Sequence, residues 1–240
     1  MKVIVCKDYN ELSLRTAQVI AETVKNKPDC VLGLATGSTP VGAYEELARM
    51  YREGELDFSA VKSFNLDEYY PMKAEDEHSY HYFMNENLFS KINIKPENTR
   101  VPDGDCEDPD VMCADYEKEI SAAGGIDLQL LGIGRNGHIG FNEPGDWLWP
   151  DTHKTPLTED TMDANARFFE DGQSVPDSAV TMGMGTILRA RRIVIAASGK
   201  SKREAVAGVL AGKIDTHCPA SLLSIHPDVI LVCDEDAYGA

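Results

Sequence analysis

Residues 132–144 read GIGRNGHIGFNEP and directly follow a short apolar run at residues 126–131. The run is long enough for one buried strand. The four glycines that follow within nine residues disfavour regular structure, because glycine loses the most backbone entropy in a helix or strand. The loop carries four side chains that exchange protons or form hydrogen bonds: Asn136, His138, Asn142 and Glu143. Open α/β sheets bind ligands at such loops, so we expect a site here; the alternative is a polar turn whose histidine only caps nearby groups.

Strands and helices alternate on both sides of this loop. Apolar runs predict strands at residues 2–6, 31–34, 61–66, 192–197 and 229–233. Helical periodicity predicts helices at residues 10–25, with Asn10 as N-cap, and at 41–52, 78–89, 109–122 and about 203–210. This order predicts an α/β fold, a doubly wound, mostly parallel (Rossmann-like) sheet with helices on both faces. The 240 residues suit one domain, residues 1–240.

The composition restricts the partners of the chain. Forty acidic residues against 23 basic ones give a net charge of −17, which opposes long-range attraction to nucleic acid or to an anionic membrane. No apolar run approaches the ~20 residues that span a bilayer, and the N-terminal stretch does not read as a signal peptide. The six cysteines show no Cys-x-x-Cys spacing. We therefore expect a cytoplasmic protein with reduced thiols and a small-molecule partner.

Two turns are candidates for binding an anion. Residues 35–40, ATGSTP, lie between a strand and a helix, where free backbone N–H groups and the helix dipole attract negative charge. The candidate binding residues there are Thr36, Gly37, Ser38 and Thr39, and a simple N-cap by Ser38 or Thr39 is the alternative. The second turn, residues 198–202, reads SGKSK. It is not a nucleotide P-loop, because that motif needs a glycine where Val194 stands.

Acidic residues follow the strand predicted at residues 61–66. Asp67 and Glu68 lie at its carboxyl end, where ligands bind in parallel sheets. A carboxylate there is a candidate general base if its surroundings raise its pKa toward the working pH. Neighbouring side chains of an extended segment point in opposite directions, so only one of the two acids is expected to serve the site. His78 and His81 favour aromatic packing over metal binding, and we expect no metal site.

Residues 146–179 form the longest weakly patterned segment. Such a segment in a compact domain is typically a lid over a site. It contains Arg167 in the sequence Arg-Phe-Phe, where a guanidinium could reach an anion while the aromatic rings anchor the segment; a surface arginine is the alternative. Trp147 and Trp149 also lie here, without an evident role.

Four segments together resemble the glucosamine-6-phosphate deaminase (isomerase) family: residues 35–40, 64–69 (FNLDEY), 132–144 and 165–169 (NARFF). The resemblance covers essentially the whole chain. It implies conversion of glucosamine 6-phosphate and water to fructose 6-phosphate and ammonia, with no redox cofactor and no catalytic metal. Galactosamine 6-phosphate deaminase, 6-phosphogluconolactonase and a sugar-phosphate sensor without turnover remain alternatives.

The resemblance also implies roles for individual residues. Asp67 would carry a proton between sugar carbons C2 and C1, and His138 would open the pyranose ring. Asn136 and Glu143 would orient and tune the imidazole; because an asparagine carries no charge, Glu143 should supply more of the electrostatic stabilisation. The phosphate would be surrounded by Ser38, Thr39, Arg167 and Lys202.

One departure concerns regulation. Longer, allosterically activated members of the family carry a C-terminal extension and several basic residues soon after the Asn-Glu-Pro motif. Residues 146–155 of this chain contain only Lys154 and His153 as basic groups, and the sequence ends at Ala240. We therefore predict hyperbolic kinetics, no activation by N-acetylglucosamine 6-phosphate, and a monomer or small homo-oligomer.

Overall fold

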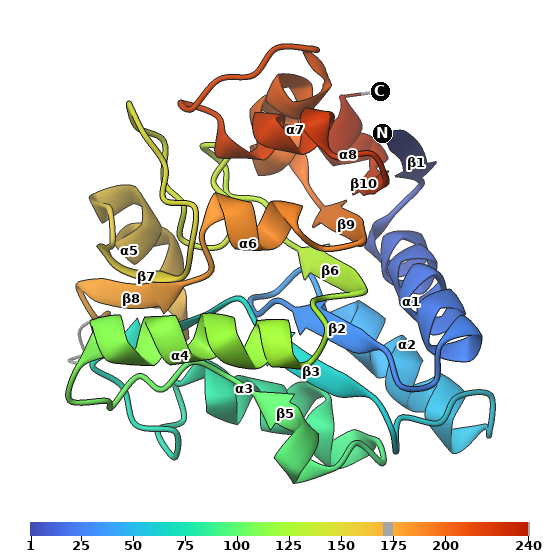
Figure 1. Ribbon diagram of the computed structural model, residues 1–240. Coiled ribbons are helices and arrows are strands. Elements are labelled where there is room, and N and C mark those ends of the chain that lie inside the picture. The colour runs from blue at the N-terminus through green and yellow to red at the C-terminus, as the bar shows by residue number, and fades with distance from the viewer. Residues whose placement is uncertain (170–174, 240) are drawn as a thin grey trace.

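The computed structural model describes residues 1–169 and 175–239. Its centre is a sheet of seven parallel strands in the order β1-β10-β9-β6-β2-β3-β5, which confirms the predicted α/β fold with a mostly parallel sheet (Figure 1). The strands are β1 (Lys2–Cys6), β2 (Val31–Leu34), β3 (Lys62–Asn65), β5 (Thr99–Arg100), β6 (Leu128–Leu131), β9 (Arg192–Ala197) and β10 (Val229–Asp234). β5 was not predicted, because two polar residues give no strand pattern; it pairs at the edge of the sheet with β3.

Helices cover both faces of this sheet. α1 (Tyr9–Asn26) and α2 (Val41–Arg52) pack together on one face, and α4 (Pro109–Ala122) and α6 (Met184–Leu188) lie on the other (Figure 1). The remaining helical segments are α3 (Tyr80–Asn87), α7 (Arg203–Leu210), α8 (Glu235–Tyr238), η1 (Phe89–Lys91), η2 (Pro96–Asn98), η4 (Lys200–Lys202) and η5 (Pro219–Ile225). Within the described residues, no helix combines the length and the apolar character needed to span a membrane.

The start of the first helix corrects one prediction. α1 begins at Tyr9, and its N-cap is Asp8, not Asn10. Asp8 has the extended backbone that a cap requires, and its carboxylate accepts a hydrogen bond of 2.9 Å from the N–H of Glu11. An acidic side chain at this position also interacts favourably with the positive end of the helix dipole, which explains why the earlier residue caps the helix.

A second, smaller sheet lies beside the first. Its strands β4 (Asp67–Tyr70), β8 (Ser178–Thr181) and β7 (His153–Pro156) pair antiparallel in the order β4-β8-β7. The segment predicted as a lid, residues 146–179, thus supplies β7, the helix α5 (Glu159–Asn165), the turn η3 (Ala166–Phe168) and the start of β8; residues 170–174 of it lie outside the described residues. These strands are four residues long and carry mostly polar side chains, so apolar periodicity did not predict their pairing.

The position of the candidate loops follows from the strand order. β2 and β6 are neighbours, yet the chain continues from β2 toward β3 and β5 and from β6 toward β9 and β10. This reversal is the topological switch point of a doubly wound sheet, and ligands bind in the crevice at the carboxyl ends of the two strands that flank it. Both the turn at residues 35–40 and the loop at residues 132–144 start at those two ends.

Candidate active site

A cavity of about 430 Å³ opens at the switch point. It is lined by the loops that follow β2, β6 and β9, by the junction of β3 and β4, and by α5 and η3. Most of the predicted site residues line it: Thr36, Gly37, Ser38, Thr39, Asp67, His138, Arg167 and Lys202. The other two, Asn136 and Glu143, lie behind His138 and face a neighbouring open depression. The fold therefore brings together groups that are up to 166 residues apart, from Thr36 to Lys202.

The turn after β2 lines the cavity and does not cap α2. α2 begins after Pro40, without any side-chain cap, so the alternative that Ser38 or Thr39 caps it is wrong. Gly37 has a φ of +92°, a conformation that favours glycine. The hydroxyl of Tyr9 donates to the carbonyl oxygen of Ser38 at 3.0 Å and thereby fixes the turn. The hydroxyls of this turn thus remain available to the cavity.

Two cations stand at the same end of the cavity. Arg167, on η3, donates from Nη2 to Oγ of Ser38 at 3.2 Å, so η3 contacts the turn after β2. Lys202 comes from the turn after β9, and burial, aided by the nearby Arg167 and Arg135, lowers its pKa. The N–H of Gly199 in that turn donates to Asp234 instead of pointing at a ligand. This turn therefore contributes the ammonium group of a lysine to the cavity, and the N–H of Gly199 does not contribute.

Asp67 lies at the point where the chain passes from the large sheet to the small one. Its side chain is buried, and burial together with the nearby Glu68 raises its pKa to about 8. Glu68 does not line the cavity; its carboxylate accepts hydrogen bonds from the backbone N–H groups of Tyr69, Tyr80 and His81. As predicted, only one of the two adjacent acids faces the site. A carboxyl group that titrates near neutral pH has the property required of a general base.

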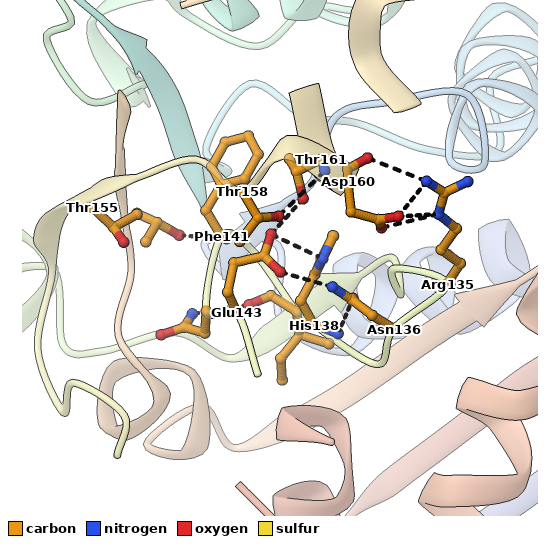
Figure 2. A network of polar contacts seen from close by, with 12 residues as sticks. Arg135, Asn136, His138, Phe141, Glu143, Thr155, Thr158, Asp160 and Thr161 are labelled. Atoms are coloured by element: carbon orange, nitrogen blue, oxygen red, sulfur yellow. Dashed lines mark hydrogen bonds and ion pairs between the residues drawn. The ribbon is translucent and has the colours of Figure 1, made fainter. Parts of the chain in front are cut away.

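His138 lies between the cavity and a second carboxylate (Figure 2). Its Nδ1 is 3.2 Å from Oε1 of Glu143, and its backbone N–H donates to Oδ1 of Asn136 at 3.1 Å. Asn136 in turn donates from Nδ2 to Oε2 of Glu143 at 2.8 Å, and the hydroxyl of Thr161 donates to Oε1. Burial raises the pKa of Glu143, but contacts with His138, Thr161 and Asn136 outweigh burial and lower the pKa to about 2. Glu143 is therefore a carboxylate at any working pH.

Several residues near the site were missed by sequence reasoning, among them Thr161, Tyr80, Asp160 and Arg135. Thr161 contacts Glu143, Tyr80 lines the cavity beside Asp67, and Asp160 forms an ion pair with Arg135. The acidic residues after Thr158 are a recognisable helix start, but no local pattern reveals that this helix lies on the loop after β6. His78 stacks on Phe169 with ring centroids 4.7 Å apart, in agreement with the predicted aromatic packing.

Fold and cavity together define a class of protein. Cations, hydroxyls, a carboxyl group and an imidazole all line the same cavity. This arrangement is that of an α/β enzyme which holds a small anionic substrate at the switch point and exchanges protons with it. The chain belongs to the glucosamine-6-phosphate isomerase/6-phosphogluconolactonase family, whose model matches residues 9–231.

Relatives cover the whole chain. Glucosamine-6-phosphate deaminases of Halothermothrix orenii and Clostridium perfringens strain 13 are 53% and 54% identical to it over 237 residues, which are 99% of this chain and 98% of each relative. A solved structure described as a monomeric glucosamine-6-phosphate deaminase is 47% identical, with a TM-score of 0.97 over 100% of this chain and 99% of that one. The 6-phosphogluconolactonase of Trypanosoma brucei is 22% identical, with a TM-score of 0.80 over 99% and 97% of the two chains, and shares the fold.

Proposed function

We propose that this enzyme converts glucosamine 6-phosphate and water to fructose 6-phosphate and ammonia. The observation that carries the proposal is that Asp67 and His138 line the same cavity as Ser38, Arg167 and Lys202. A phosphate bound by the cations would fix one end of the sugar and leave its reacting carbons beside the two acid–base groups. The names of the relatives at 53% and 54% identity support the same reaction.

The geometry supports a different role for each of these residues. The imidazole of His138 takes the proton of the sugar O1 and delivers it to the ring oxygen, which opens the pyranose. Glu143, ionised and 3.2 Å from Nδ1, stabilises the imidazolium that forms between these two transfers. Asp67, as a carboxylate, removes the proton from C2 and returns it to C1, while a proton passes from the amino group to O1, so that the C1 aldehyde becomes a hydroxymethyl group and the C2 amine becomes an imine. The resulting C2 imine is hydrolysed by water, which releases ammonia and leaves the ketone.

An ammonia-release assay on a panel of substrates tests this proposal. The chain should release ammonia from glucosamine 6-phosphate with a higher kcat/KM than from galactosamine 6-phosphate, and it should not hydrolyse 6-phosphogluconolactone. Preference for the galacto epimer would identify a deaminase of that sugar. Lactone hydrolysis without ammonia release would assign the chain to the other branch of the family.

The proposal also covers the domain organisation, the oligomeric state and the cellular location of the protein. We infer that residues 1–240 act as a single domain in which α5 and its flanking segments cover the cavity. We also infer that the enzyme is a cytoplasmic monomer, since the solved relative at 47% identity is described as monomeric and the six cysteines are free, as in a reducing compartment. Light scattering at assay concentration should give a mass close to the 26.4 kDa of one chain.

A further inference from the structure

Helix α5 touches the loop after β6 at two successive residues (Figure 2). Asp160 pairs with Arg135, with 2.8 Å between Nε and Oδ1, and Thr161 donates its hydroxyl to Oε1 of Glu143. The first contact is exposed, whereas Thr161 is only 3% exposed. Exposed ion pairs contribute little, but a buried hydrogen bond to a carboxylate is both strong and directional. Thr161 is therefore the contact through which α5 acts on the site.

The hydroxyl of Thr161 is not needed by its own helix. The N-cap of α5 is Thr158, whose Oγ1 accepts the backbone N–H of Thr161 at 3.3 Å. The side chain of Thr161 instead reaches Oε1 of Glu143, the same oxygen that lies 3.2 Å from Nδ1 of His138. Asn136 holds the other oxygen at 2.8 Å. Each oxygen of the carboxylate thus has a neutral donor, and the plane of the carboxylate is fixed relative to the imidazole.

We propose that Thr161 is a positioning residue whose hydroxyl holds Oε1 of Glu143 against His138, so that docking of α5 completes the acid–base pair. The assignment of this pair to ring opening rests on the proposed function. Without the hydroxyl, the carboxylate keeps only the Asn136 donor and is free to turn away from Nδ1. Its stabilisation of the imidazolium then falls, although the phosphate-binding end of the cavity is unchanged.

Other charged groups face the pair, and the proposed variants leave all of them in place. The cavity side presents Asp67, Arg135, Asp160, Arg167 and Lys202. The depression on the Glu143 side presents Lys200, Arg203 and Glu204 in addition to Arg135 and Asp160. Removal of one neutral hydroxyl therefore leaves the charge of each of these groups in place, and its effect on the site is exerted through the Glu143 carboxylate.

The first experiment compares kcat and KM for ammonia release. Thr161→Val keeps the shape and removes the hydroxyl; it should lower kcat by roughly tenfold or more, the effect of one hydrogen bond to a charged group, with KM changed less than twofold. Thr161→Ser should restore most of kcat, and Thr161→Ala provides a second hydroxyl-free variant should the valine fold poorly. Thr158→Ala is the matched control, because it removes the cap of α5, lowers the Tm and should leave kcat within twofold.

The second experiment needs no substrate. In the free enzyme at one fixed pH, the NMR signals of the His138 ring should shift in Thr161→Val and remain in place in Thr158→Ala. Unshifted ring signals in Thr161→Val would overturn the positioning role, as would equal losses of kcat in the valine and serine variants. If the wild-type chain releases no ammonia from any amino-sugar phosphate, the proposed function fails, and the ring signals still decide the role of Thr161.

Discussion

Asp67 is buried and Glu143 is partly buried, yet their pKa values are shifted in opposite directions. Burial beside another acid raises the pKa of Asp67 to about 8, while three polar contacts lower that of Glu143 to about 2. A carboxyl group that is half-protonated near neutral pH can carry a proton between two carbons, whereas one that never protonates can only stabilise a neighbouring cation. The different surroundings of these two residues thus support different roles.

Replacement of Asp67 by asparagine tests its role as base. The active form of the base is the carboxylate, so kcat/KM of the wild type should rise with pH and level off above about pH 8. Asp67→Asn should lack this rise and should abolish exchange of the C2 proton with solvent in D₂O, while substrate protection against thermal unfolding persists. Continued exchange in the variant would place the base elsewhere.

The same substitution should stabilise the fold. The folded-state pKa of about 8 lies above the usual Asp value of 3.8, so the contribution of Asp67 to stability is greatest below about pH 4 and is lost as the pH rises through 8. Asp67→Asn cannot ionise and avoids this cost. We expect its free energy of unfolding to exceed that of the wild type by about 5 kcal/mol at pH 8 and to match it near pH 4. Equal curves at both pH values would contradict the raised pKa.

His138 can be tested with a substrate that needs no ring opening. His138→Gln keeps a polar side chain but cannot shuttle a proton between O1 and the ring oxygen. Its kcat/KM should fall by about a hundredfold or more on the closed sugar and much less on an open-chain analogue that carries the same phosphate. Equal losses on both substrates would argue against a role in ring opening.

At the level of elements, the loop after β6 depends on close packing of its own backbone. A Cβ added at Gly134 would lie 2.4–2.5 Å from three atoms of the His138 ring. Gly134→Ala should therefore displace the imidazole, reduce kcat by roughly a hundredfold and leave the Tm within a few degrees, because the clash can be relieved by movement of one side chain. Gly54→Ala is the control. A Cβ added at Gly54 meets no atom within 4 Å, although the φ of +76° at this position entails a small loss of stability. Unimpaired turnover in Gly134→Ala would show that the ring is not held by this contact.

The elements differ in how well the sequence predicts them. Buried parallel strands read as continuous apolar runs, so β2 and β9 were predicted with the bounds that the structure has. β7 (His153–Pro156) and β8 (Ser178–Thr181) carry mostly polar residues and form only because they pair with one another and with β4. Such strands are stabilised by partners far away in sequence, and their own residues contain no period that could be recognised.

The residues of the site likewise differ in how well the sequence predicts them. Asp67, His138 and Ser38 all come soon after the carboxyl end of a predicted strand, so their convergence at one sheet edge was predictable from the strand order. Thr161 and Tyr80 reach the site from α5 and α3, whose positions depend on contacts with the small sheet and on Glu68. A sequence without an alignment has no signal for contacts of this kind.

For the molecule as a whole, the distribution of charge matters more than its sum. The chain carries a net charge of −17, which repels a sugar phosphate at long range. The cavity nevertheless brings Arg167 and Lys202 together, and Arg167 contacts Ser38 of the turn after β2. We infer that substrate capture depends on this local cluster, because the field of the remaining surface opposes it.

A second phosphate site of this kind is not built in the segment after the Asn-Glu-Pro motif. Its two basic residues are engaged within the protein: the ammonium of Lys154 lies 4.3 Å from the centroid of the Tyr70 ring, and Nδ1 of His153 is 2.9 Å from the carbonyl oxygen of Asp151. Burial also lowers the pKa of His153, which disfavours its charged form. An effector phosphate would therefore find no cluster of cations there comparable to that of the cavity.

We accordingly predict a hyperbolic dependence of ammonia release on glucosamine 6-phosphate, with a Hill coefficient of about 1. Cooperativity requires two states coupled between sites, and a monomer with one substrate site offers no such coupling. N-acetylglucosamine 6-phosphate should leave KM unchanged or compete weakly at the cavity, and Lys154→Ala should leave this response as it is. Rates should be measured at several protein concentrations alongside the mass of the species. A sigmoidal curve that the effector makes hyperbolic would require a second site and more than one subunit.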